Sequence, residues 1–141
     1  MLKNSTCFVA GGRTGFIGTH VTKTLLELGA QVFAMSKSST KASNFDLCTP
    51  DLIQFTGDMS QSIRLDKLGV DYVFHCAAHT AGAKEMTENP VAQVTENLLM
   101  NSLLLETAAK NKIKKFVFIS SSAIYPEDSK PLPEEMGFVA D

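Results

Sequence analysis

Glycines between positions 11 and 18 are the residues whose spacing most clearly suggests chemistry. They follow a short apolar run, 6–10, and open a stretch with helical spacing. Glycine lets the backbone turn sharply and approach a pyrophosphate, whose charge is met by the free amides at the start of a helix. This context predicts a phosphate-binding loop, and the alternative is a tight turn without a ligand. The loop consists of Gly11, Gly12, Arg13, Thr14, Gly15, Phe16, Ile17 and Gly18.

Further candidate residues follow the other apolar runs of the chain. Ligands of parallel α/β sheets bind beyond the carboxyl ends of the strands, so the residues directly after each strand are the first candidates. They are Ser36 and Lys37 after the second run, Asp58 and Met59 after the third, Cys76, Ala77, Ala78, His79 and Thr80 after the fourth, and the serines 120–122 after the fifth. Asp58 has the alternative role of capping a short helix. His75, inside the fourth run, is expected to be a hydrogen-bonded core residue.

The elements that position these residues alternate along the chain. Five short apolar runs predict buried strands, at 6–10, 31–35, 52–56, 71–76 and 115–120. A helical stretch follows Gly15 with Ile17, Val21, Leu25 and Leu28 at helical spacing, and a long helix follows Pro90 with Val91, Val94, Leu98 and Leu105 on one face. Strands that alternate with helices predict an α/β fold, a Rossmann-type doubly wound parallel sheet truncated after about five strands.

Composition excludes several other classes of protein. The chain has 141 residues, 44% of them hydrophobic and 20% charged, with a formal net charge of -2. This length predicts one domain, and the near-neutral charge argues against a nucleic acid or a membrane surface as partner. Neither a membrane-length apolar run nor a signal-peptide core is found in the sequence. The cysteines at 7, 48 and 76 are too widely spaced for a metal pair, so we expect free thiols in a reducing cytoplasm and no metal.

The glycine loop resembles the cofactor loop of the extended short-chain dehydrogenase/reductase family, the NAD(P)-dependent sugar-nucleotide epimerases and dehydratases. Gly57-Asp58 is similar to the adenine-contacting turn of the family, and the segment 75–78 to the backbone beside the nicotinamide ribose. Asn97 falls on a recurrent asparagine of the central helix. The loop is one residue longer than usual, so either Gly11 or Gly12 could be the turn glycine.

The segment 118–126 resembles the end of the fifth strand of the family, which carries the catalytic serine. The match makes Ser121 that serine, and the phrasing of the segment is most similar to GDP-fucose synthases and GDP-mannose epimerases. The resemblance implies that residues 1–141 are the N-terminal portion of a dinucleotide-binding domain, without the C-terminal substrate region. It also implies a nucleotide sugar as the substrate of the full-length enzyme, and a homodimer.

The residues after the second strand bear on the choice of cofactor. NAD-selective sheets usually place a carboxylate there to bond the ribose 2′-hydroxyl. This sequence has Ser36 and Lys37 instead, and Arg13 can reach the same place. A 2′-phosphate suits these groups, so we predict NADP, with NAD as the alternative. The other interpretation is a solvated polar loop.

The same resemblance predicts that the chain alone is inactive. The family needs a tyrosine and a lysine four residues apart on one helix face, where the lysine lowers the pKa of the tyrosine. Four residues after Tyr72 stands Cys76, and four after Tyr125 stands Ser129. The chain is therefore expected to be the NAD(P)-binding portion of an epimerase, dehydratase or reductase. The alternatives are a dinucleotide-binding regulatory module without catalysis and a flavin mononucleotide domain.

Overall fold

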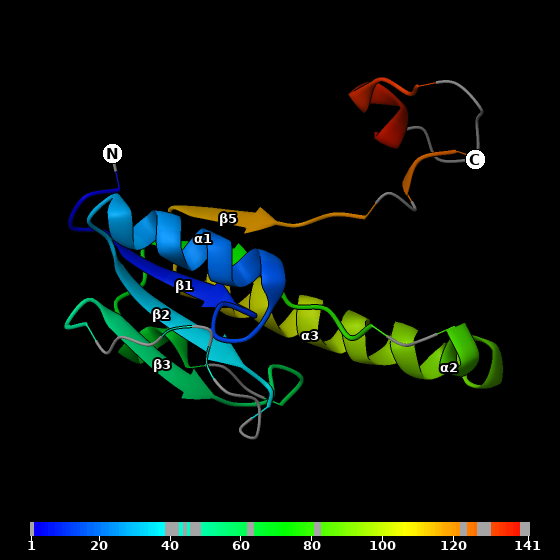
Figure 1. Cartoon of the computed structure of the whole chain (residues 1–141), viewed down its shortest axis with the longest axis horizontal. Coiled ribbons are helices and arrows are strands. Elements are labelled where there is room, and N and C mark those ends of the chain that lie inside the picture. The colour runs from blue at the N-terminus through cyan, green and yellow to red at the C-terminus, as the bar shows by residue number, and fades with distance from the viewer. Residues whose placement is uncertain are drawn as a thin grey trace.

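A single parallel sheet forms the centre of the computed structural model (Figure 1). The structure describes residues 2–38, 43, 45, 49–61, 64–80, 83–121, 124–126 and 131–138. Its strands are β1 (Thr6–Ala10), β2 (Gln31–Ser36), β3 (Leu52–Thr56), β4 (Tyr72–His75) and β5 (Lys115–Phe118). They are hydrogen-bonded in the order β3-β2-β1-β4-β5, and every pair is parallel. The predicted Rossmann-type fold is confirmed, and β4 and β5 end earlier than expected.

Helices cover both faces of this sheet (Figure 1). Helix α1 (Phe16–Glu27) lies on one face and the long α3 (Pro90–Lys110) on the other. The chain also forms the short α2 (Ala83–Glu88) and the 3-10 turns η1 (Leu65–Lys67) and η3 (Glu134–Phe138). Side chains of β1 alternate between the two faces, because successive residues of a strand point in opposite directions. Cys7 and Val9 pack in one cluster with Leu25 of α1. Phe8 packs in the other with Met100 and Leu104 of α3.

The faces that the two long helices turn to the sheet differ from the expected ones. Val91, Val94, Leu98 and Leu105 share a face of α3, but they are 55% to 67% exposed. The buried stripe of α3 is formed by Met100, Leu104 and Ala108. Helix α3 has two apolar stripes, so helical spacing alone does not tell which one packs on the sheet. In α1, Leu25 is buried as expected, whereas Ile17 and Leu28 are exposed.

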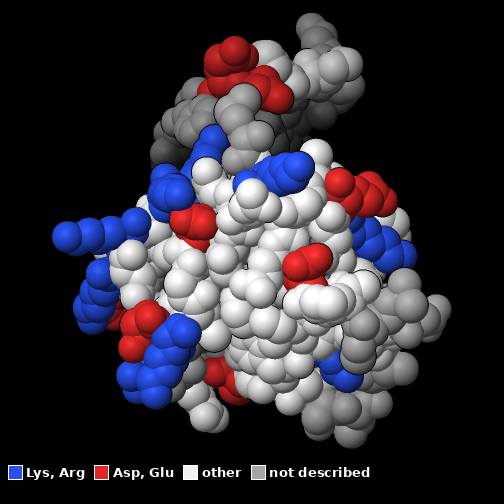
Figure 2. All heavy atoms as spheres, turned by 90° about the vertical axis from the view of Figure 1, so that its left-hand side faces the viewer, with Lys and Arg blue, Asp and Glu red and all other residues white. Residues whose placement is uncertain are grey.

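One carboxylate ties three strands together at their amino-terminal ends. Asp71, directly before β4, accepts a hydrogen bond from the amide of Thr6 in β1 at 3.0 Å. It also pairs with Nζ of Lys114, the residue before β5, at 2.8 Å. The Lys114 hydrogen bond, with help from the Thr6 amide, lowers the pKa of Asp71. Figure 2 looks onto this end of the molecule, where basic and acidic side chains are interspersed around an uncharged centre. None of the described helices is both long and apolar enough to span a membrane.

Candidate functional site

A pocket of about 250 Å³ lies at the carboxyl ends of the strands. Most of its lining comes from residues that the sequence pattern had indicated: Gly11, Thr14, Gly15, Ser36, Lys37, Asp58, Met59, Cys76, Ala77, Ala78 and His79. The structure adds Ser38, Ser60, Glu96 and Met100. Glu96 and Met100 carry no local signal in the sequence, because α3 brings them to the strand ends from a distant part of the chain.

The glycine loop lines one wall of this pocket with Gly11, Thr14 and Gly15, two of which have no side chain. Gly11 has a φ of +78°, and a Cβ there would lie 3.0 Å from the carbonyl oxygen of Cys76. A Cβ on Gly15 would lie 2.7 Å from the oxygen of Gly11, and one on Gly12 would meet the side chains of Val9 and Thr22. The positive φ identifies Gly11 as the turn glycine that the sequence left open. Close approach of backbone to a ligand is what such a cradle permits.

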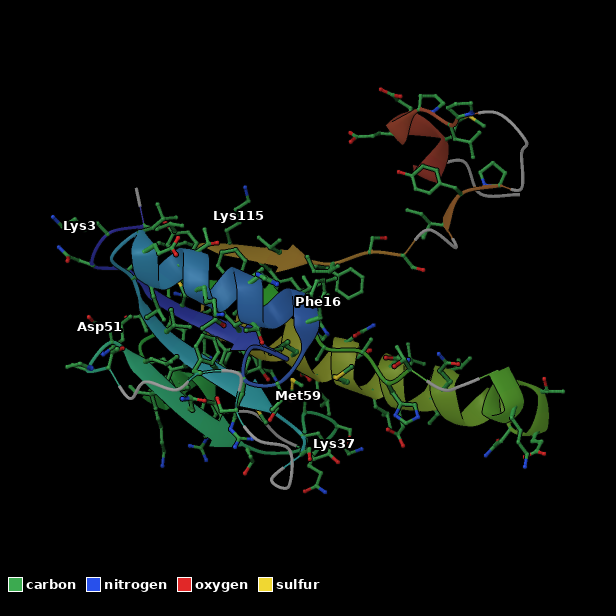
Figure 3. All side chains as sticks on the ribbon, in the orientation of Figure 1. Lys3, Phe16, Lys37, Asp51, Met59 and Lys115 are labelled. Atoms are coloured by element: carbon green, nitrogen blue, oxygen red, sulfur yellow. The ribbon has the colours of Figure 1, made fainter. Side chains whose placement is uncertain are left out.

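Helix α1 begins directly after this cradle. Gly15 is its N-cap and offers no side chain to the first turn, which also contains no acidic residue. The first amides of a helix have no partner within it and favour an anion. Neither Phe16 nor Ile17 lines the pocket. Phe16 is 80% exposed and contacts the His20 ring, so any role of these two residues in the site falls to their amides (Figure 3).

Arg13 reaches the end of β2, as expected. Its Nη1 donates hydrogen bonds to Oγ of Ser36 at 3.4 Å and to the carbonyl oxygen of Ser38 at 3.0 Å. Ser36 Oγ in turn donates to the same Ser38 oxygen at 3.2 Å. Arg13 does not itself line the pocket, nor does Gly12 or Gly18. The Arg13 guanidinium therefore lies at the end of β2 but outside the pocket lining, within hydrogen-bond distance of the Ser36 hydroxyl.

Lys37, which is labelled in Figure 3, lines the pocket and lies between two carboxylates. Its Nζ is 3.4 Å from Asp58 Oδ2 and 3.2 Å from Glu96 Oε2. The hydrogen bond with Glu96 is the main cause that raises the pKa of Lys37, and Asp58 contributes. Asp58 Oδ1 accepts from the amide and the hydroxyl of Ser60, at 2.9 Å and 2.7 Å, and these bonds lower the pKa of Asp58. Asp58 thus caps a turn and faces the pocket at the same time.

Asn97 of helix α3 is hydrogen-bonded to the loop after β4. Its Oδ1 accepts from the amide of His79, and its Nδ2 donates to the His79 carbonyl oxygen, both at 2.9 Å. A third bond, from Nδ2 to the Gln93 oxygen, fixes the amide plane at 2.9 Å. The imidazole of His79 also contacts Glu96, with Nδ1 3.1 Å from Oε2. Asn97 lies outside the pocket lining and acts on the site through this loop.

His75 is buried below the same loop, and its prediction as a hydrogen-bonded core residue is confirmed. Its Nε2 lies 2.8 Å from Oδ1 of Asn101. Burial lowers the pKa of His75, so the neutral ring is favoured. Cys7 and Cys76 are free, as expected, and burial raises the pKa of Cys7 to about 11. Cys48 lies outside the described residues.

Ser121 is not brought to the pocket. It is exposed, three residues beyond the end of β5, and its carbonyl oxygen accepts from the amide of Ile124 at 3.3 Å. Figure 1 shows the segment after β5 leading away from the sheet. Ser122 lies outside the described residues. Among the residues that are described, no group of three His, Cys, Asp or Glu side chains is arranged to hold a metal ion.

Known proteins are similar to this chain in sequence and in fold. UDP-glucose 4-epimerase from Pisum sativum is 31% identical over 92% of this chain and 41% of the relative. An epimerase from Methanothermobacter thermautotrophicus has a similar structure, with a TM-score of 0.80 and 29% identity over 96% of this chain and 41% of that one. UDP-glucose 4-epimerase from Bifidobacterium longum, solved with NAD+ and UDP, gives a TM-score of 0.77 at 27% identity and covers 93% and 42%.

The chain spans about two fifths of the length of these relatives. The family model described as "NAD dependent epimerase/dehydratase family" matches residues 7–138, nearly the whole chain. The glycine loop, the strand order and the pocket at the strand ends agree with that match. The chain therefore belongs to the NAD dependent epimerase/dehydratase family.

Proposed function

We propose that this chain is the dinucleotide-binding portion of an enzyme that epimerises, dehydrates or reduces a nucleotide sugar. The observation that carries the proposal is the backbone cradle of Gly11 and Gly15, which opens into a pocket of about 250 Å³ at the start of α1. A pyrophosphate fits such a cradle because it needs close approach to backbone amides and a helix N-terminus. The nicotinamide of a bound cofactor supplies the hydride chemistry, while the protein supplies binding and orientation.

The pocket lining divides into regions that suit the parts of a dinucleotide. Glycines 11 and 15 would hold the pyrophosphate, and Asp58 with Met59 would meet the adenine. Ser36 at the end of β2 would meet the adenosine ribose, and the Cys76–Ala78 segment would pass beside the nicotinamide ribose. Asn97 would keep this last segment in place through its two bonds to His79.

The cofactor that we propose is NADP, with NAD as the alternative. Arg13 supports this choice, since it supplies a guanidinium at the end of β2, where an NAD-selective sheet has an acid. The Bifidobacterium longum relative was solved with NAD+, so both cofactors must be measured. A charge-assisted contact to the 2′-phosphate contributes about 1.5–3 kcal/mol, equivalent to roughly tenfold or more in affinity.

Calorimetric titration with NADP+, NAD+ and flavin mononucleotide tests the proposal. We expect the two pyridine dinucleotides to bind, NADP+ more tightly, and flavin mononucleotide not to bind. Gly15→Val should abolish binding because the side chain would fill the cradle, whereas Gly69→Ala, outside the pocket lining and with no atom within 4 Å of the added Cβ, should retain it. A folded Gly15→Val protein that still binds would show that the loop is only a turn.

For the substrate, we propose a nucleotide sugar, and the serine segment favours a reaction of the GDP-fucose synthase type. Neither tyrosine of the chain has a lysine four residues later, and Ser121 lies outside the pocket. We therefore propose that this chain alone is inactive. Assays with NAD+ or NADPH and with UDP- or GDP-linked sugars should show no turnover above buffer. Turnover that disappears in Ser121→Ala would contradict this and would require another base within the chain.

A second candidate function is a dinucleotide-binding regulatory module without catalysis. The position of Ser121 outside the pocket favours it over an enzyme complete within these residues. The two candidates differ in what the protein does to a nucleotide sugar. Within the full-length protein, a module that only senses the dinucleotide should bind NADP+ without turning over UDP- or GDP-linked sugars, whereas the enzyme should turn them over.

A further inference from the structure

Strand β2 ends without an acidic residue, yet the folded chain places two carboxylates at that point. Asp58 comes from the turn after β3, and Glu96 comes from α3, 59 residues beyond Lys37. Both lie within ion-pair distance of Lys37 Nζ, at 3.4 Å and 3.2 Å. All three residues line the same pocket. The sequence at the end of β2 has no acidic residue, but the fold brings the carboxylates of Asp58 and Glu96 to that position.

We propose that Glu96 is a specificity-determining residue that limits the preference of this site for a 2′-phosphorylated dinucleotide. The inference rests on the proposed function and names a determinant that lies outside the glycine loop and the end of β2. A 2′-phosphate needs the positive charge at the end of β2. Glu96 holds Lys37 in an ion pair, so the phosphate gains less from Lys37 than the sequence suggests.

Glu96 is better suited to this role than Asp58 because its bonds are confined to side chains that line the pocket. Asp58 Oδ1 is held by the amide and hydroxyl of Ser60, so its removal would also disturb the turn. Glu96 Oε2 contacts Lys37 Nζ and His79 Nδ1, and its side chain is 42% exposed on α3. Loss of its charge therefore changes the electrostatics of the pocket while the helix remains intact.

Arg13 and Lys37 approach the end of β2 in different ways, which separates their contributions. Arg13 is held by Ser36 and Ser38 and provides the cation on which the proposed NADP preference rests. Lys37 is directed toward α3 by Glu96. Neutralising Glu96 should leave the Arg13 contact unchanged and release Lys37 toward the phosphate.

The experiment measures dissociation constants of NADP+ and NAD+ for the wild-type chain, Glu96→Gln, Lys37→Met and the double variant. We expect Glu96→Gln to raise the preference for NADP+ over NAD+ by about three- to fivefold, the upper part of the range of an exposed ion pair. Lys37→Met alone should change the ratio little, whereas in the double variant it should cancel the gain. Glu106→Gln is the matched control, because Glu106 lies on the same helix and pairs with Lys110.

The outcomes separate the inference from the proposed function. If the wild-type chain binds neither dinucleotide, the proposed function is wrong and the inference fails with it. If both bind but Glu96→Gln leaves their ratio at the wild-type value, or Glu106→Gln shifts it equally, only the inference is overturned. A gain that persists in the double variant would also overturn it, because the gain must act through Lys37. Circular dichroism of each variant checks that α3 is retained.

Discussion

The regions around α1 and α3 both contribute to the pocket, but the first does so with its backbone and the second with its side chains. At α1 the site is built from backbone, because Gly11, Gly15 and Gly18 bring the loop and the helix together without side chains between them. At α3 the site is built from side chains, since Glu96 and Asn97 reach across to Lys37 and His79. Backbone contacts leave no room for added atoms, whereas side-chain contacts can be removed one at a time.

The two helices also differ in their outer surfaces. On α1 the exposed apolar residues include Phe16 and Ile17 at its first turn. On α3 an apolar stripe containing Val94 and Leu98 runs along the side away from the sheet. The inner stripe of α3 carries the packing energy, so substitutions on its two sides should have very different effects. Substitutions at the glycine loop and then along α3 test this difference.

Gly18→Ala should have the largest effect on dinucleotide binding. A Cβ at this position would overlap the carbonyl group of Gly11, which is backbone and cannot move aside. Overpacking of this kind costs about 1–3 kcal/mol of unfolding free energy, and the displaced loop should also lose dinucleotide binding. Alanine has a higher helix propensity than glycine, by about 1 kcal/mol. A loss of unfolding free energy is therefore measurable only if the steric cost is larger than this gain.

Gly69→Ala is the control for this substitution. Gly69 has a φ of +58°, and a Cβ there would meet no other atom within 4 Å, so only the backbone conformation opposes an alanine. A left-handed residue with a Cβ costs about 1–2 kcal/mol, and dinucleotide binding should be retained. Urea unfolding and calorimetry measure both quantities. Retained dinucleotide binding in Gly18→Ala would show that the loop tolerates a wider separation from α1.

The second prediction compares two leucines on the two sides of α3. Leu104 is fully buried against the sheet, and Leu98 is 64% exposed. Leu104→Ala should lower the unfolding free energy by about 2–5 kcal/mol, because it removes buried methyl groups and leaves a cavity. Leu98→Ala should change it by less than about 0.5 kcal/mol. Both substitutions have the same helix propensity, so urea unfolding isolates the packing. Equal losses would mean that the outer stripe is covered in solution.

Local signals in the sequence were enough for the sheet and the glycine loop. The run 6–10 is buried on both faces, and the order of strands and helices determines a doubly wound sheet once crossovers are right-handed. Side-chain partners far apart in the sequence gave no such signal. Glu96 meets Lys37 across 59 residues, and Asn101 meets His75 across 26. Their pairing depends on how α3 lies across the strand ends, which spacing alone does not determine.

The smallest predicted effect is a pH dependence that arises where α3 meets β4. Asn101 Oδ1 can only accept, so Nε2 of His75 donates the hydrogen, and Nδ1 is left as a buried acceptor with no partner in the described part of the chain. Protonation would place a charge at this buried nitrogen, which is why burial lowers the pKa of His75.

The folded pKa of His75 lies below the unfolded value of about 6.5, so the unfolded chain takes up the proton first. Stability from this residue is therefore complete above that pH and is lost as the pH falls below it, at about 1.4 kcal/mol for each unit by which the pKa is lowered. Proton NMR of the His75 imidazole measures this directly. We expect the ring to titrate below the ordinary histidine pKa of about 6.5. His75→Gln should flatten the pH dependence of the unfolding free energy between about pH 5 and 7. A His75 ring that titrates at the ordinary value would show that the α3–β4 contact is open to water.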